Sequence, residues 1–126
     1  MQYEFHKWHS DRVGMEMGVL RIGHWGPALV YFPTCGGDHT EFERYVMQED
    51  ARPWIEAGKV QIFSVDAINH LTWYNSNLHP ADKVRWAEGY EGYVVHEVVP
   101  LIRHLTQNPF IGCFGSSWGG YTVTNF

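Results

Sequence analysis

The sequence predicts an α/β fold in which a mostly parallel sheet carries helices on both faces. Two observations support this prediction. After two opening strand patterns, the chain alternates strand, helix, strand, helix and strand through residues 28–115, and parallel strands need such crossover elements. Of the 126 residues, 44% are hydrophobic and 18% are charged, which supplies the apolar surface of a core and excludes a disordered chain.

Two extended segments open the chain. Residues 2–9 alternate loosely between polar and apolar side chains, and residues 13–22 form a second extended run that ends at Gly23. Turn residues follow this glycine. We therefore expect an antiparallel hairpin at the start of the sheet, with the parallel strands coming after it.

Three further segments have the apolar pattern of strands that are buried on both faces. Residues 28–33 (ALVYFP) lead into a glycine-rich loop at 34–38. Residues 59–67 (KVQIFSVDA) lead into an aromatic loop at 68–80, and residues 111–115 (IGCFG) lead into a turn rich in serine and glycine. Loops at the carboxyl ends of strands bind ligands in open α/β sheets, so these loops are where a site is expected.

The first helix is predicted between Thr40 and Gly58. Thr40 can cap this helix, and apolar residues that include Val46 follow at helical spacing. Pro53 is expected to interrupt the helix, and Gly58 is a typical stop signal.

The clearest helix is predicted over residues 82–105. Its apolar residues step by three or four positions, which places them in a single stripe that faces the core. Pro100 is expected to bend this helix, and the Asn-Pro pair at 108–109 is expected to stop it.

Charge and composition exclude several classes of protein. Nine Lys and Arg against fourteen Asp and Glu give a net charge of −5 with no basic cluster, so we expect neither nucleic acid nor membrane as a partner. No apolar run has the length of a signal peptide or a membrane span. Cys35 and Cys113 are too few for a disulfide scaffold and are predicted to fill buried strands. The eight histidines lack the spacing of metal ligands, so we predict no metal, and we predict no cofactor either. Taken with the lack of an apolar span and the small number of cysteines, the composition predicts a soluble, cytoplasmic protein.

One short motif points to chemistry. Residues 115–119 (GSSWG) satisfy the pattern G-x-S-x-G, with Ser117 as the central serine. This pattern is typical of a sharp turn between a strand and a helix that exposes a serine hydroxyl, and the flanking residues must be small so that the arms of the turn do not collide. The same residues also suit a glycine-rich turn in which Ser116 or Ser117 merely caps a helix.

Four segments together carry a resemblance to a known family. They are residues 30–37 (VYFPTCGG), Asp66 with residues 73–75 (WYN), residues 90–102 (YEGYVVHEVVPLI) and residues 115–121 (GSSWGGY). Over nearly its whole length the chain resembles the amino-terminal half of the esterase family of α/β-hydrolases that contains S-formylglutathione hydrolase-like and mycolyltransferase-like enzymes. The resemblance implies an α/β-hydrolase-like sheet that is incomplete in this chain.

The resemblance also implies an activity. Ser117 would attack small or medium acyl esters and form an acyl-enzyme. The oxyanion would be held by the backbone N–H groups of Trp118 and Gly37. Trp73 and Tyr74 are candidates for the acyl or alcohol pocket, although the same side chains would equally suit a plug in the core.

The acid and the base of a serine triad are missing after Ser117. The nine residues that follow it contain neither a carboxylate nor a histidine, although the α/β-hydrolase order is serine, acid, histidine. The strand at 111–115 would also present an open apolar edge. We therefore expect residues 1–126 to be a single domain, the amino-terminal half of an α/β-hydrolase ending just after the nucleophile elbow. The Asp and His would come from another chain or a missing carboxyl-terminal half, with a complementary chain or self-association as the partner.

Two other interpretations stay open at this point. The chain would be a non-catalytic α/β-hydrolase-derived module that binds a partner or ligand through its uncovered edge, or a truncated product of a longer gene.

Overall fold

Five strands form one mixed sheet in a computed structural model of the chain, which describes residues 1–45 and 47–126. The strands are β1 (Tyr3–Ser10), β2 (Met15–Ile22), β3 (Ala28–Phe32), β4 (Gln61–Val65) and β5 (Ile111–Gly115), in the spatial order β1-β2-β4-β3-β5. β2 pairs antiparallel with β1 and β4, whereas β3 pairs parallel with β4 and β5. The predicted antiparallel hairpin followed by parallel strands is confirmed.

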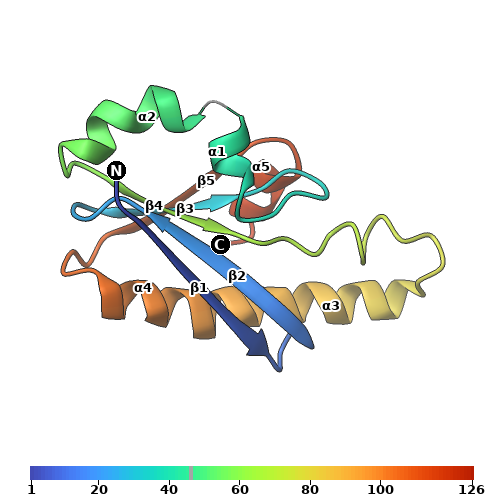
Figure 1. Ribbon diagram of the computed structural model, residues 1–126. Coiled ribbons are helices and arrows are strands. Elements are labelled where there is room, and N and C mark those ends of the chain that lie inside the picture. Colours follow the sequence, from blue (N-terminus) through green and yellow to red (C-terminus); the bar gives the residue numbers. More distant parts are fainter. Residues whose placement is uncertain (46) are drawn as a thin grey trace.

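Helices cover both faces of the sheet (Figure 1). On one face lie α1 (Glu41–Arg44) and α2 (Met47–Glu56). Along the other face runs one continuous helix made of α3 (Pro80–Tyr93), the π-helical segment η1 (Val94–Val98) and α4 (Val99–Leu105). The short helix α5 (Trp118–Val123) follows β5 and contacts β3 and β5. Across residues 1–45 and 47–126, none of these helices combines the length and apolar character needed to cross a membrane.

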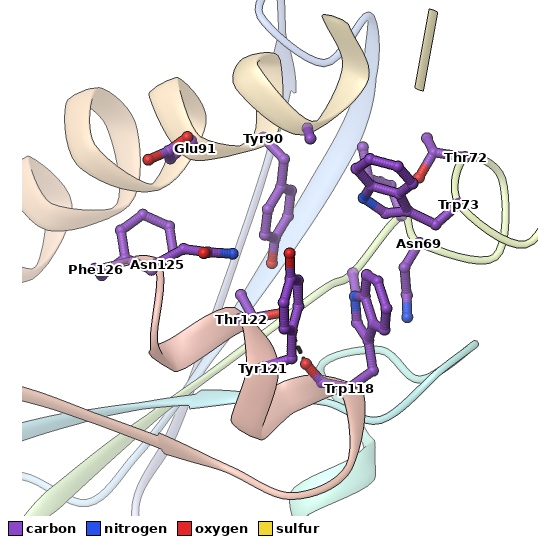
Figure 2. Close-up of a pocket in the computed structure, with 13 residues that line it drawn as sticks. Asn69, Thr72, Trp73, Tyr90, Glu91, Trp118, Tyr121, Thr122, Asn125 and Phe126 are labelled. Atoms are coloured by element: carbon purple, nitrogen blue, oxygen red, sulfur yellow. Dashed lines mark hydrogen bonds between the residues drawn. The ribbon is translucent and has the colours of Figure 1, made fainter. Parts of the chain in front are cut away.

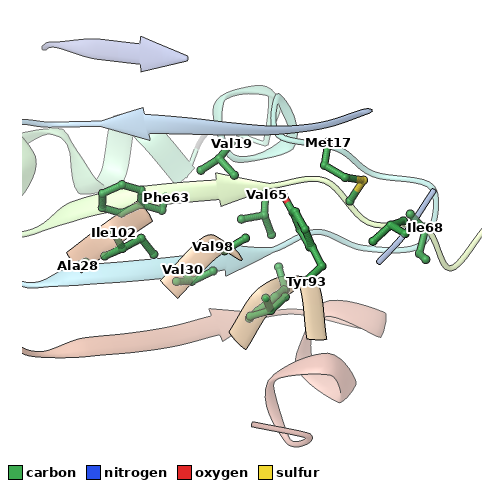
Figure 3. Packing of buried hydrophobic residues seen from close by; sticks show 13 residues of the cluster. Met17, Val19, Ala28, Val30, Phe63, Val65, Ile68, Tyr93, Val98 and Ile102 are labelled. Atoms are coloured by element: carbon green, nitrogen blue, oxygen red, sulfur yellow. The ribbon is translucent and has the colours of Figure 1, made fainter. Parts of the chain in front are cut away.

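The sheet separates two hydrophobic clusters, because successive residues of β3 point to opposite faces. Val30 belongs to the larger cluster, which also contains Val98 of the long helix (Figure 3). Tyr31 packs on the other face with Phe42 of α1 and Ile55 of α2. β3 is therefore buried on both faces, as its continuous apolar run predicts, and it lies between the strands that carry the candidate site.

The first helical region differs from its prediction. Two helices replace the single one, and α2 continues through Pro53. Pro53 is exposed, and so is Glu49, so the carbonyl group that loses its helical partner at the proline remains open to solvent. Thr40 does not cap α1 with its side chain, because its hydroxyl donates to Asp38. Val46, predicted on the apolar side, lies outside the described residues.

The long helix accommodates Pro100 by a local change of hydrogen bonding. Just before this proline, the Val99 N–H donates to the carbonyl of Val94, five residues back, instead of four. A proline has no N–H and its ring clashes with the preceding turn, and the wider π turn relieves this conflict within the helix. The helix thus runs on to Leu105 and covers the sheet along its whole length (Figure 1).

Glu97, in the π-helical segment, links the long helix to the first hairpin. Trp8 Nε1 and Ser10 Oγ each donate to its carboxylate at 2.8 Å, and Arg12 donates at 3.2 Å. Burial opposes ionisation of Glu97, but these three hydrogen bonds outweigh it and lower the pKa of the carboxyl group. This contact fixes the register of the helix on the sheet.

The two cysteines are exposed, so the prediction that they fill buried strands is wrong. Cys35 lies beyond the end of β3, in the glycine-rich loop. Cys113 lies in β5, whose residues are only partly covered because this strand is at the edge of the sheet.

Candidate active site

Three loops meet at one edge of the sheet. Because β3 runs parallel to both β4 and β5, the loops after these three strands leave the sheet at the same end (Figure 1). They are the glycine-rich loop after β3, the aromatic loop after β4 and the turn after β5. Open α/β sheets bind their ligands at this edge.

Ser117 has a strained backbone at the tip of the turn after β5. Its φ of 55° and ψ of −124° make it the one non-glycine residue with positive φ among residues 1–45 and 47–126. The side chain is exposed and makes no capping hydrogen bond to α5, so the interpretation of Ser117 as a helix cap is not supported. Strain of this kind persists only where surrounding structure enforces it, and it is common at catalytic residues.

The two glycines of the motif are required by close packing around Ser117. A Cβ on Gly115 would lie 2.6 Å from the carbonyl carbon of Gly119 and 2.7 Å from the carbonyl oxygen of Phe32. A Cβ on Gly119 would collide with that same Phe32 oxygen and lie 2.9 Å from the oxygen of Pro33. These neighbours are all backbone atoms, so they cannot move aside as a side chain would.

Gly119→Ala is therefore expected to lower the free energy of unfolding by about 3 kcal/mol, the upper range for overpacking, because the end of β3 must shift. Gly120→Ala is the matched control, since a Cβ there would meet its first neighbour only at 3.3 Å. Urea denaturation of both variants measures the difference. Equal midpoints for the two variants would contradict this account of the turn.

Two backbone regions offer hydrogen-bond donors near the serine. The Trp118 N–H, at the first position of α5, has no acceptor among the described residues. In the loop after β3, the Gly37 N–H donates to the carbonyl of Thr34 at 3.0 Å, whereas the N–H groups of Cys35 and Gly36 have no acceptor within the part of the chain that the structure describes. The role of the Gly37 N–H as an oxyanion donor stays a prediction, because this group would first have to give up its hydrogen bond to Thr34. The N–H groups of Cys35 and Gly36 could bind an oxyanion without breaking an existing hydrogen bond.

A buried carboxylate shapes the loop after β3. Glu41, the first residue of α1, is 1% exposed. Its carboxylate accepts hydrogen bonds from the Tyr31 hydroxyl at 2.6 Å, from the Thr34 N–H at 2.8 Å and from the Thr34 hydroxyl. A Cβ on Gly37 would collide with this carboxylate. The loop therefore folds around the Glu41 side chain.

Tyr31 connects this buried carboxylate to the serine turn. Burial and the hydrogen bond to Glu41 both raise the pKa of the Tyr31 hydroxyl well above its ordinary value, while an interaction with the side chain of Ser116 acts in the opposite direction. Tyr31 is thus a neutral donor to Glu41, and its ring packs against Phe114 of β5 with 5.1 Å between the ring centroids. Through this one side chain, the loop after β3 is held against β5, the strand that leads into the serine turn.

An aromatic groove lies beside the serine turn. The aromatic loop after β4, helix α3 and helix α5 line this groove, which is open to solvent (Figure 2). Trp73 and Trp118 both line this groove. Tyr74 is not a lining residue, but its ring packs edge-on against Trp118, with 5.4 Å between the ring centroids. Of the two predicted aromatic residues, Trp73 therefore lines the groove and Tyr74 packs against Trp118.

A histidine and an aspartate form a pair at the same end of the strands, but on the side of the sheet where β1 and β2 lie. His39 Nδ1 lies 2.7 Å from Asp66 Oδ1, and Asp66 also accepts the N–H groups of His39 and Gly18. The His39 ring packs on Phe5 of β1 at 4.6 Å between centroids. β1 is at the opposite edge of the sheet from β5, so this pair lies on the far side from Ser117 and fastens the loop after β3 to β2 and β4.

Sequence reasoning missed two residues of this region. Glu41 begins a helix, where an acidic residue usually faces solvent, so nothing in the local pattern marks it as buried. Asn69 is 3% exposed and lines the groove, but in the sequence it is one more polar residue in an irregular loop.

This arrangement of strands, crossover helices and strained serine turn is the α/β-hydrolase fold, in which the turn after a strand carries the nucleophile. The predicted fold class is thereby confirmed.

Solved structures give the same assignment. An S-formylglutathione hydrolase from Agrobacterium tumefaciens superimposes with a TM-score of 0.68 at 17% identity, covering 96% of this chain and 50% of that one. The fluorophosphonate-binding serine hydrolase F of Staphylococcus aureus gives 0.64 at 18%, covering 95% and 49%. An IroE-like serine hydrolase from Shewanella oneidensis gives 0.60 at 16%, covering 98% and 45%. No protein-family profile and no curated protein matches the sequence. The chain spans about half the length of these structures, and the likeness establishes its fold.

Proposed function

We propose that this chain supplies the nucleophile and the oxyanion hole of a serine esterase that acts on small or medium acyl esters. The observation that carries the proposal is the backbone of Ser117, an exposed serine with a φ of 55° between a strand and a helix. No packing role explains the cost of that conformation, whereas a nucleophile needs it to project its hydroxyl above the sheet edge.

The chemistry follows from this position. The Ser117 oxygen attacks the ester carbonyl while a general base takes the hydroxyl proton, and a tetrahedral oxyanion forms. Donors for that oxyanion are the Trp118 N–H and an N–H of the loop after β3, from Cys35, Gly36 or, if its bond to Thr34 opens, Gly37. Collapse of the oxyanion breaks the ester C–O bond, and the base returns its proton to the leaving oxygen, so that the alcohol departs and an acyl-serine remains. The same base then activates a water molecule, which releases the carboxylic acid and restores the Ser117 hydroxyl.

A fluorophosphonate probe tests the nucleophile directly, and one of the structural neighbours is a fluorophosphonate-binding serine hydrolase. The full protein that carries these residues, including the polypeptide that supplies its general base, is incubated with the probe and digested, and the modified peptide is mapped by mass spectrometry. Modification of one serine, Ser117, supports the proposal. Modification at any other residue, or none under conditions that label a control serine hydrolase, would overturn it.

We further propose that the Asp and His of the triad come from polypeptide outside these 126 residues, in a complementary chain or carboxyl-terminal half, or from a second copy. Two observations support this. The described His–Asp pair, His39 with Asp66, lies toward the opposite edge of the sheet from Ser117. Strand β5, which carries the serine turn, has only β3 as a neighbour within residues 1–45 and 47–126.

The 126-residue chain by itself is therefore expected to hydrolyse 4-nitrophenyl acetate slowly, retaining only what the oxyanion hole supplies without a base, orders of magnitude below an intact triad. It is also expected to self-associate or bind a hydrophobic dye through the open edge of β5. Light scattering and an ester assay on the same sample measure both. A monomer of 14.6 kDa with turnover of about 10 s⁻¹, the median for enzymes, would contradict the proposal.

The open edge of β5 also favours a second candidate function, a non-catalytic module that binds a partner there. The fluorophosphonate experiment separates the two, because a binding module needs no reactive serine.

A further inference from the structure

The aromatic groove contains a polar side chain that has no partner. Asn69, in the loop after β4, is 3% exposed, and neither its Oδ1 nor its Nδ2 meets a hydrogen-bond partner among the described residues. The backbone of Asn69 is satisfied differently, since its carbonyl accepts the N–H groups of Thr72 and Tyr74. Leaving a buried amide unpaired costs about 1–3 kcal/mol per polar group, so such a residue needs an explanation.

The surroundings of Asn69 define what it can recognise. In Figure 2 the Asn69 side chain lies beside the ring of Trp118, with the ring of Trp73 above it in this view, and all three residues line the groove. Tyr90 and Tyr121 line the same groove. A planar group that enters here meets aromatic surfaces and one carboxamide with a free donor and a free acceptor.

From this geometry we propose that the groove selects esters that carry a secondary amide in the part of the molecule that occupies it. A secondary amide has one N–H and one carbonyl, which complement the free oxygen and the free NH₂ of Asn69. A hydrocarbon chain would fill the groove but would leave both polar atoms unpaired. The carboxylate of Glu91, also on the groove, disfavours an anionic group, whereas a secondary amide carries no charge.

This inference rests on the proposed esterase function, because the groove is next to the proposed nucleophile. Trp118 directly follows Ser117 in the chain, and Trp118 lines the groove. Either the acyl part or the alcohol part of an ester attached at Ser117 would lie in the groove. A secondary amide can be present in the acyl part or in the alcohol part, and the experiment below distinguishes these two cases.

The test compares kcat/KM for matched esters in the full protein that carries these residues. In the acyl series, the 4-nitrophenyl ester of N-acetyl-4-aminobutyrate is compared with the ester of heptanoate, which has the same chain length. In the alcohol series, the acetate ester of N-acetylethanolamine is compared with pentyl acetate. We expect a preference for the amide in one series, and we expect Asn69→Leu to reduce that preference about tenfold, the value of one hydrogen bond to a buried group.

A second readout does not depend on turnover. Asn69→Leu removes two buried, unpaired polar atoms and keeps a similar volume, so it is expected to raise the melting temperature. Asn75→Leu is the matched control, because Asn75 is outside the groove lining and its side chain has partners, donating to the carbonyl of Leu71 and accepting the N–H of Asn77. This control is expected to keep the amide preference and not to raise the melting temperature.

Fluorophosphonate labelling separates the two levels of failure. If the wild-type protein is not labelled, the proposed function and this inference both fall. If labelling is normal in wild type and in Asn69→Leu but the amide preference is unchanged in both ester series, the inference alone is overturned. A lower melting temperature for Asn69→Leu would also overturn it, because it would show that Asn69 is bonded within the protein.

Discussion

In the full protein with its general base in place, replacing Ser117 with alanine is expected to abolish fluorophosphonate labelling and to lower esterase turnover by roughly 10⁴–10⁶-fold, because no other group forms the acyl-enzyme. The matched control is Ser116→Ala. Ser116 is the neighbouring serine, which is also exposed but does not have a positive φ. We expect it to keep labelling within about tenfold of the parent rate, the value of one hydrogen bond. Loss of labelling in Ser116→Ala together with retention in Ser117→Ala would reverse the assignment.

The strained backbone of Ser117 also predicts how substitutions at this position change the stability of the protein. Glycine adopts a φ of 55° without steric cost, whereas alanine does not. Ser117→Gly is therefore expected to be more stable than Ser117→Ala by about 1 kcal/mol, with both variants inactive. Urea denaturation measures this difference. Equal stability of the two variants would show that the turn is relaxed, and would remove the main support for the nucleophile.

Replacing Glu41 is expected to have the next largest effect, because it is a positioning residue for the loop after β3. Glu41→Ala leaves the hydroxyl groups of Tyr31 and Thr34 and the Thr34 N–H without an acceptor in a buried site. Each buried donor left without an acceptor costs about 1–3 kcal/mol. We expect this variant to be severely destabilised and to lose most of its labelling.

Glu41→Gln keeps the shape of the side chain and tests the role in catalysis separately from folding. An amide accepts fewer hydrogen bonds than a carboxylate, so the loop is held less firmly. We expect kcat to fall 10- to 10²-fold, less than the 10²–10³-fold typical for complete loss of an oxyanion donor, while KM changes little, since that donor acts mainly in the transition state. Glu43→Gln, exposed on the same helix, is the control. A folded Glu41→Gln protein with unchanged kcat would show that the carboxylate has no influence on the oxyanion hole.

Local sequence patterns were sufficient for the backbone of this site. The apolar runs at 28–33, 59–67 and 111–115 predicted β3, β4 and β5. A strand that is buried on both faces carries apolar residues at consecutive positions and does not alternate them with polar ones. The motif at 115–119 predicted the serine turn, because the steric demand that excludes side chains at Gly115 and Gly119 acts within five residues. The aromatic residues at 73 and 74 were likewise placed near the serine turn by the rule that ligand loops follow parallel strands.

The boundaries of the helices were harder to predict, because proline acts according to its surroundings. Pro53 was expected to break a helix and lies inside one, where its side of α2 is exposed. Pro100 was expected to bend the long helix, and a π turn before it takes up the conflict. In each case the outcome depends on solvent exposure and on neighbouring hydrogen bonds, which a single sequence does not contain.

By itself, the sequence determined the class of fold, the order of strands and helices, and the turn that exposes Ser117, since each of these follows from periodicity or from sterics between near neighbours. Only the tertiary structure decided which polar groups meet. β4 inserts between β2 and β3, and α1 folds back over the end of β3, which brings Glu41 to Tyr31 and Asp66 to His39. The same packing leaves the side chain of Asn69 without a hydrogen-bond partner among residues 1–45 and 47–126. Such pairings join residues that are far apart in the chain, and their energies depend on burial and geometry that exist only after the sheet has formed.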